Sequence, residues 1–111
     1  MKETYDVRWS ETAERDLIGI VEYIADDSPS RACEVFREIR KKASSLRTFP
    51  RRGPVVHELH DQGITQYHEL IVSPWRIIYR VSERTVYVLS VFDSRRSLED
   101  ILLRRLTGLK L

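Results

Sequence analysis

The chain has one cysteine, four glycines and no long run of apolar residues. One cysteine cannot form an intramolecular disulfide, and scattered glycines form no glycine-rich loop for a nucleotide phosphate. No apolar stretch approaches the length of about 20 residues that crosses a bilayer. The sequence also lacks the pattern of a secretory signal, so we expect a cytoplasmic protein with no contact to a membrane.

Length and charge set the next limits. A chain of 111 residues is long enough to bury roughly two-thirds of its surface on folding, so we expect residues 1–111 to form a single domain. The net charge is +2, but acidic residues concentrate in positions 1–30 and basic residues in positions 31–60. Two interpretations stay open: the segments are helix faces of opposite charge that pair with each other, or the second one is a basic binding surface.

Two segments have the periodicity of amphipathic helices. In the first, apolar residues recur at three- and four-residue spacing after Ser10, which can cap a helix that ends near residue 26. Ser28 and Pro29 then supply a second cap and a favourable first helical residue, and another apolar stripe follows. The sequence therefore predicts a strand at about 5–9 followed by a hairpin of two helices.

Alternation of apolar and polar residues predicts three strands, at about 66–72, 75–82 and 85–92. Their connections are short enough to make neighbouring strands antiparallel. The polar stretch 55–64 is predicted to be a loop, with at most a short strand, and residues after 97 have the pattern of an amphipathic helix. The predicted fold class is α+β: an N-terminal αα-hairpin packed on a small antiparallel β-sheet, in the order strand, two helices, three strands and C-terminal helix.

Arginines inside the predicted strands are the most informative feature for function. Arg76 and Arg80 point the same way along the middle strand, about 13 Å apart at the rise of a β-strand, which suits phosphates or carboxylates on a partner. Arg95 and Arg96 follow the last strand, near the start of a helix, where anions are favoured. The alternative is that these arginines form surface ion pairs with acidic neighbours: Glu69, Glu83 or Asp93.

The other reactive side chains match no catalytic or metal-binding motif. His57 and His60 lack the spacing of the helical zinc-protease motif and have no cysteine nearby, so we expect no metal site. No serine lies in a nucleophile-elbow pattern, and we expect no other cofactor. The leucines of the predicted C-terminal helix, which include Leu98 and Leu102, either dock on the protein's own core or contact a partner.

The order and spacing of these elements resemble the RelE/ParE superfamily of bacterial toxins over nearly the whole chain. The segments that carry the resemblance are Arg52-Gly53-Pro54 with Glu58-Leu59, His68 to Val72, Trp75 to Val81, and Val86 to Val91 running into Arg95-Arg96. The resemblance implies the toxin of a type II toxin–antitoxin pair. It further implies that a cognate antitoxin wraps the toxin surface and holds it inactive in a hetero-oligomer.

Within that superfamily, RelE-like members are ribosome-dependent mRNA endonucleases, which need a base, cations at the scissile phosphate and an acid. The candidates for such a site are His68, Glu69 and Arg76, of which Arg76 matches the strand arginine that contacts phosphate in those enzymes. Those enzymes also carry a tyrosine or histidine near the C-terminus. Here the last tyrosine is Tyr87, inside a predicted strand, and the last histidine is His68.

ParE-like members resemble the endonucleases in fold but poison DNA gyrase without cleaving RNA. Because the C-terminal tyrosine or histidine is missing, the sequence favours this activity over that of an enzyme. The residues then expected to bind the target or the antitoxin are four arginines and two leucines: Arg76, Arg80, Arg95, Arg96, Leu98 and Leu102. A third hypothesis is a non-toxic interaction domain that binds the acidic tail of a partner.

Overall fold

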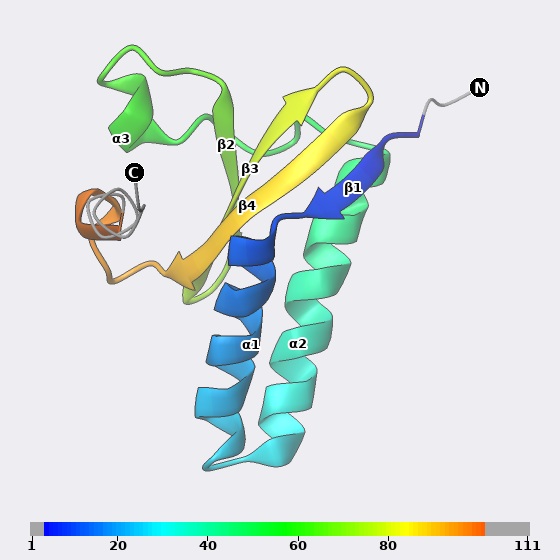
Figure 1. The fold of residues 1–111 in the computed structure, drawn as a ribbon, viewed down its shortest axis with the longest axis vertical. Coiled ribbons are helices and arrows are strands. Elements are labelled where there is room, and N and C mark those ends of the chain that lie inside the picture. Colours follow the sequence, from blue (N-terminus) through cyan, green and yellow to red (C-terminus); the bar gives the residue numbers. More distant parts are fainter. Residues whose placement is uncertain (1–3, 102–111) are drawn as a thin grey trace.

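A four-stranded β-sheet with a helical hairpin on one face forms the fold in the computed structural model, which describes residues 4–101 (Figure 1). The elements in chain order are β1 (Asp6–Trp9), α1 (Glu11–Ala25), α2 (Pro29–Ser44), the short 3₁₀ helix η1 (Ser45–Arg47), α3 (His57–His60), β2 (Tyr67–Val72), β3 (Trp75–Ser82) and β4 (Thr85–Asp93). A further helical turn occupies residues 98–101. The predicted α+β fold is confirmed.

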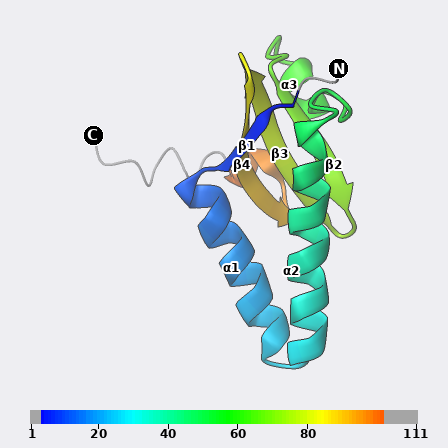
Figure 2. The ribbon, with the colours of Figure 1, turned by 90° about the vertical axis from the view of Figure 1, so that its right-hand side faces the viewer.

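The helical hairpin forms where the capping residues predict it. Ser10 and Ser28 are the N-caps of α1 and α2, and their hydroxyl oxygens accept hydrogen bonds from main-chain N–H groups one turn ahead. Pro29 lies in the first turn of α2. Main-chain N–H groups in the first turn have no acceptor within the helix, so a proline there costs no hydrogen bond. The two helices lie side by side and extend beyond one end of the sheet (Figure 2).

The strands lie in the order β1-β4-β3-β2. β2, β3 and β4 pair antiparallel, as their short connections predict, with a register shift between β3 and β4 at Ile78 and Tyr79. β1 pairs parallel with β4, which differs from the wholly antiparallel sheet that we predicted. Short turns fix the relative direction only of strands that follow each other in the chain. β1 is separated from β4, its neighbour in the sheet, by the whole helical hairpin and by β2 and β3.

Side chains on the two faces of the sheet form two separate cores. On the face under the helices, Ile77 and Tyr79 of β3 are fully buried and pack with the apolar stripes of α1 and α2. On the other face a smaller core forms under α3 and the C-terminal helical turn. Its buried members are Val56, Ile78, Phe92, Leu98 and Ile101.

The stretch 55–64 differs from its prediction as a loop. It contains the single-turn helix α3, together with a bridge between Val55 and His68. Val56 and Leu59 lie three residues apart and anchor the turn on the outer core. One turn is too short to show a helical period against its polar neighbours, which is why the sequence pattern did not reveal it.

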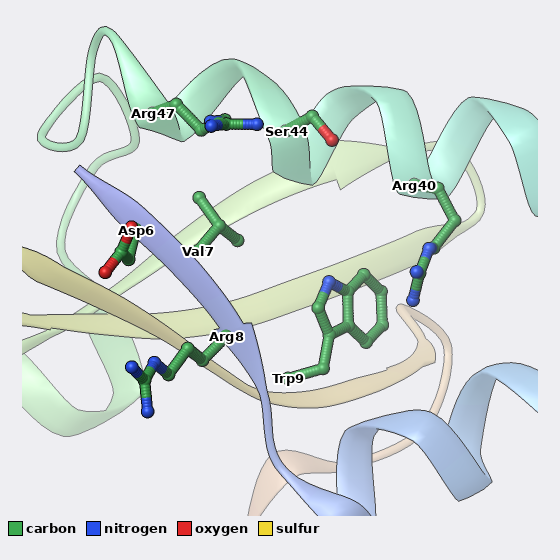
Figure 3. A pocket seen from close by; sticks show the side chains of 7 residues that line it. All are labelled: Asp6, Val7, Arg8, Trp9, Arg40, Ser44 and Arg47. Atoms are coloured by element: carbon green, nitrogen blue, oxygen red, sulfur yellow. The ribbon is translucent and has the colours of Figure 1, made fainter. Parts of the chain in front are cut away.

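The fold leaves one outer edge of the sheet beside a groove. The edge belongs to β1, and a groove of about 430 Å³ lies between it and the C-terminal half of α2 (Figure 3). No helix within residues 4–101 combines the length and apolar character needed to cross a bilayer.

Candidate functional site

The face of the sheet away from the helical hairpin carries the arginines of β3. Arg76 and Arg80 project there together with Ile78, while Ile77 and Tyr79 point into the main core. This face is not fully open. α3 and the C-terminal helical turn cover part of it, as Figure 1 shows, and the environments of Arg76 and Arg80 differ accordingly.

Arg76 is buried, with 7% of its surface exposed. Its Nε donates to Oε1 of Glu69 at 2.6 Å, and its two terminal nitrogens donate to the two carboxylate oxygens of Glu58 at 2.8 and 2.9 Å. The guanidinium carbon also lies 5.3 Å from the centroid of the Phe92 ring. Bidentate pairing of guanidinium with carboxylate is among the strongest hydrogen-bond geometries in proteins, so Arg76, Glu58 and Glu69 form one ion network that ties α3 to the sheet.

The network shifts the ionisation of its members. The hydrogen bonds from Arg76 lower the pKa of Glu58 from 4.5 to about 2, although partial burial acts in the opposite direction. The hydrogen bonds to Glu58 raise the pKa of Arg76 in turn, and those to Glu69 act in the same sense. The pair Arg76–Glu58 is therefore ionised from mildly acidic pH upward.

We expect acid to weaken the fold through Glu58. A carboxylate whose pKa is lower in the folded state stabilises the protein fully above its unfolded value of 4.5, and this stabilisation disappears as the pH falls to about 2. Glu58→Gln should lower the free energy of unfolding at pH 7 and reduce its loss between pH 5 and pH 2. Urea denaturation at a series of pH values measures both effects.

The control for that experiment is Glu83→Gln, which removes an exposed carboxylate from the turn between β3 and β4. This variant should keep the acid sensitivity of the wild type. If Glu58→Gln and the wild type lost equal stability on acidification, the ion pair with Arg76 would not be the source of the effect.

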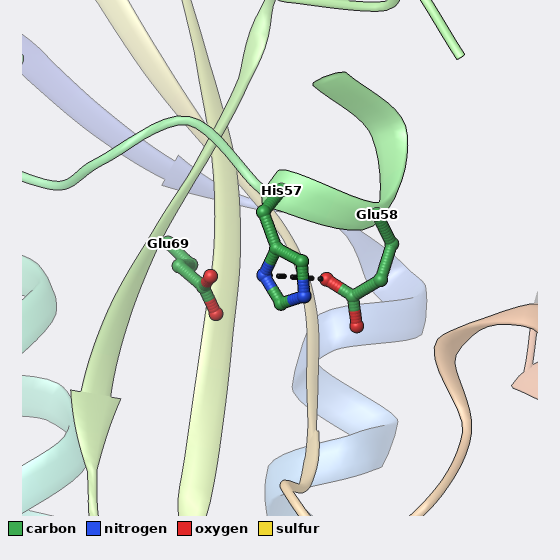
Figure 4. A group of neighbouring side chains, drawn as sticks. All are labelled: His57, Glu58 and Glu69. Atoms are coloured by element: carbon green, nitrogen blue, oxygen red, sulfur yellow. Dashed lines mark ion pairs between the residues drawn. The ribbon is translucent and has the colours of Figure 1, made fainter. Parts of the chain in front are cut away.

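The two carboxylates of this network and the neighbouring His57 have atoms of the kinds that bind metal ions. Ligand atoms of His57, Glu58 and Glu69 all lie within 4.8 Å of one another (Figure 4). However, both carboxylates already accept hydrogen bonds from Arg76, whose positive charge would repel a metal ion at the same place. We therefore assign the cluster to the ion network.

Of the three candidates for an RNA-cleaving site, His68 lies apart from Glu69 and Arg76. His68 and Glu69 are neighbours on β2 and point to opposite faces of the sheet. Nδ1 of His68 lies 2.8 Å from the carbonyl oxygen of Gly53, and its ring stacks on Tyr79 on the helix side. Glu69 is 8% exposed and hydrogen bonded to Arg76 on the other side. His68 therefore lies on the opposite face from the pair Arg76 and Glu69, in which both side chains are buried.

Three of the predicted binding arginines are accessible. Arg80 is partly exposed, and its guanidinium carbon lies 4.7 Å from the centroid of the Tyr87 ring. The side chain of Arg95 is 80% exposed and donates to Asp93, and these hydrogen bonds lower the pKa of Asp93 from 3.8 to about 2. Arg96 is exposed beside it, and Arg95 and Arg96 border a groove of about 610 Å³ between α1 and the end of β4.

Two of the predicted binding residues are buried instead. Arg76 pairs with Glu69, which the alternative interpretation named for a surface ion pair, and also with Glu58, which α3 brings over the sheet. Leu98 is 6% exposed and packs in the outer core, so it docks on the protein itself. Leu102 lies outside the described residues. Glu58 was missed as a partner of Arg76, and the pair Val56 and Leu59 was the only sequence signal for the turn that positions it.

Solved structures of known proteins share this fold. The chain is similar to one from the chromosomal ParDE toxin–antitoxin system of P. aeruginosa, with 17% identity and a TM-score of 0.66, over 82% of this chain and 97% of that chain. It is also similar to one from the RelBE2 toxin–antitoxin complex of Mycobacterium tuberculosis, with 23% identity and a TM-score of 0.57, over 84% of this chain and 94% of that chain. At these identities the likeness shows the fold.

Sequence comparison supplies the family. No curated protein matches this sequence. The family model described as the ParE toxin of the type II toxin–antitoxin system parDE matches residues 7–98, which run from the second residue of β1 to beyond the end of β4. The resemblance noted from the sequence is confirmed, and this chain belongs to the ParE toxin family of type II toxin–antitoxin systems.

Proposed function

We propose that this ParE-family toxin poisons DNA gyrase and that a cognate antitoxin holds it inactive. The observation that carries the choice of target is the burial of Arg76 between Glu58 and Glu69. Cleavage of RNA needs a cation that reaches the scissile phosphate and a base that reaches the ribose hydroxyl. In the described part of the chain, Arg76 is neutralised by carboxylates and His68 is hydrogen bonded to the main chain. This arrangement supports a toxin that acts by binding.

The accessible arginines support the same proposal. Arg95 and Arg96 are exposed beside an open groove, and a poison that works by binding needs such a surface more than it needs a catalytic group. The antitoxin is supported by the family itself, whose members are toxins of type II toxin–antitoxin pairs. The similar structures from P. aeruginosa and Mycobacterium tuberculosis are likewise described as parts of toxin–antitoxin systems.

The proposed target can be tested with purified components. The chain, gyrase, ATP and supercoiled plasmid should together yield linear plasmid after protease treatment, which reports trapped cleavage complexes. In cells, expression of the chain alone should arrest growth with an SOS response while mRNA stays intact, and co-expression of the cognate antitoxin should restore growth. Codon-phased mRNA cleavage in a translating extract, with gyrase unaffected, would contradict the target. The absence of any growth arrest would favour the inert interaction domain.

The accessible arginines can be tested in the same assays. Replacing Arg95 and Arg96 together by alanine should reduce plasmid linearisation at least tenfold without loss of folding, because both side chains are exposed. The matched control replaces Arg31 and Arg37 on α2 by alanine, which removes equal charge from another exposed surface. Equal activity of the two double variants would show that the groove beside α1 does not contact the target.

A further inference from the structure

The outer edge of β1 presents main-chain groups that the sheet does not use. β1 is the terminal strand and pairs on one side only, with β4. The N–H of Ser10 donates to Val88 of β4, and the N–H of Asp6 donates to Arg84, the residue before β4. Alternation along the strand therefore turns the N–H and C=O groups of Val7 and Trp9 away from the sheet. Within residues 4–101 no main-chain hydrogen bond closes this edge beyond the one from Tyr5.

The groove along this edge is lined by side chains that surround the strand. Arg40, Ser44 and Arg47 approach it from α2 and the turn that follows, and Arg8 lies on the opposite side (Figure 3). The guanidinium carbon of Arg40 lies 4.9 Å from the centroid of the Trp9 ring. This contact holds a positive charge beside the outward main-chain groups of the strand.

The groove is positively charged. Three arginines line it, Arg8, Arg40 and Arg47, against one carboxylate, that of Asp6. Among the carboxylates of the described residues, none forms an ion pair with any of these three arginines. Their charge is therefore available to an anionic partner. Exposed strand edges also recruit further strands unless something blocks them.

We propose that the edge of β1 binds an extended acidic segment of the antitoxin as an added strand. The main chain of that segment pairs with Val7 and Trp9, and its acidic side chains on the α2 side pair with Arg40 and Arg47. Alternate residues of a strand are about 7 Å apart, and seven residues of helix rise by about 10 Å, so two long acidic side chains at positions i and i+2 reach both arginines.

The strand edge distinguishes a peptide from a nucleic acid. A duplex could use the three arginines for its phosphates, but it has no main-chain N–H or C=O groups to pair with Val7 and Trp9. The identity of the partner rests on the proposed function, since an antitoxin is required to supply the segment. The binding of an acidic strand to this edge does not depend on the target of the toxin.

Charge is tested first. The probe is a synthetic eight-residue peptide in which glutamate alternates with threonine, and its affinity for the intact chain is measured by titration calorimetry. Arg40→Glu with Arg47→Glu should weaken binding at least tenfold. Arg31→Glu with Arg37→Glu, which changes the same charge on the same helix outside the groove, should change it less than twofold. Equal effects of the two double variants would overturn the proposal.

The added strand is tested by Val7→Pro. Proline lacks an N–H, and at position 7 it removes only an outward donor while leaving the ladder with β4 intact. The variant should bind the peptide at least tenfold more weakly and keep the wild-type circular dichroism spectrum. N-methylation of alternate residues of the peptide tests the same hydrogen bonds without any change in the protein, and it should weaken binding equally.

Undiminished binding of the N-methylated peptide would overturn the proposal. A 20-base-pair DNA duplex provides a second test. If it bound through Arg40 and Arg47 more tightly than the peptide, and if Val7→Pro did not weaken that binding, the groove would be a nucleic-acid surface and the proposal would be overturned. Failure of the proposed function has a different signature: wild-type chain that binds the peptide but leaves growth and gyrase unaffected.

Discussion

Replacing Arg76 by alanine is expected to destabilise the protein by about 3–5 kcal/mol, the range found when one partner of a buried ion pair is removed. The substitution leaves Glu58 and Glu69 without the guanidinium that neutralises them, and Glu69 is 8% exposed. A domain of this kind has a total stability on the order of 5–15 kcal/mol, so the loss is a large part of the whole. Urea denaturation followed by circular dichroism measures it.

Arg80→Ala is the matched control for this prediction. Arg80 lies on the same strand and the same face but is partly exposed, and its contact with Tyr87 is a cation–π interaction worth about 0.5–1 kcal/mol. If Arg76→Ala proved as stable as Arg80→Ala, the ion network would contribute little. The buried arginine would then need another explanation, such as contact with the target.

A methyl group at position 53 is expected to destabilise the protein by about 3 kcal/mol, the upper end of the usual cost of overpacking a core. A Cβ on Gly53 would lie 2.2 Å from the main-chain oxygen of Glu69 and 2.8 Å from the hydroxyl oxygen of Tyr79. Neither neighbour can move easily, because one belongs to β2 and the other is fully buried. Gly53→Ala would also disturb the hydrogen bond of 3.0 Å that the Gly53 N–H donates to Tyr79.

Gly19→Ala is expected to raise the stability of the protein, in contrast to Gly53→Ala. Gly19 lies in α1 with open space where a Cβ would be, so alanine should stabilise the helix by about 0.5–1 kcal/mol. Thermal denaturation of the two variants side by side measures the difference. A Gly53→Ala variant with the same melting temperature as the wild type would show that the segment beside β2 can shift away from the strand.

Local signals in the sequence predict most of the fold. Ser10 and Ser28 mark the starts of the two helices, and the alternation along β3 correctly separates Ile77 and Tyr79 from Arg76. The parallel pairing of β1 could not be predicted in the same way, because it depends on how the whole helical hairpin returns the chain to the sheet.

The candidate site was less predictable for a related reason. The charge of Arg76 within a strand was a visible anomaly, and Glu69 was named among its possible acidic partners. Glu58 lies 18 residues before Arg76 in a polar stretch, and only the single turn of α3 brings it over the sheet. The groove at β1 likewise joins Arg8 and Arg40 from elements far apart in sequence, so no local pattern indicates it.

The most direct test of the role of Arg76 removes the whole ion network at once. In the triple variant Arg76→Met, Glu69→Met and Glu58→Gln no buried charge is left without a partner, so the fold should persist. Growth arrest is then measured in cells that express the variant and the wild type without antitoxin, at equal soluble levels. If Arg76 serves the fold alone, the folded variant arrests growth within twofold of the wild type. A folded variant that no longer arrests growth would show instead that the network acts on the target.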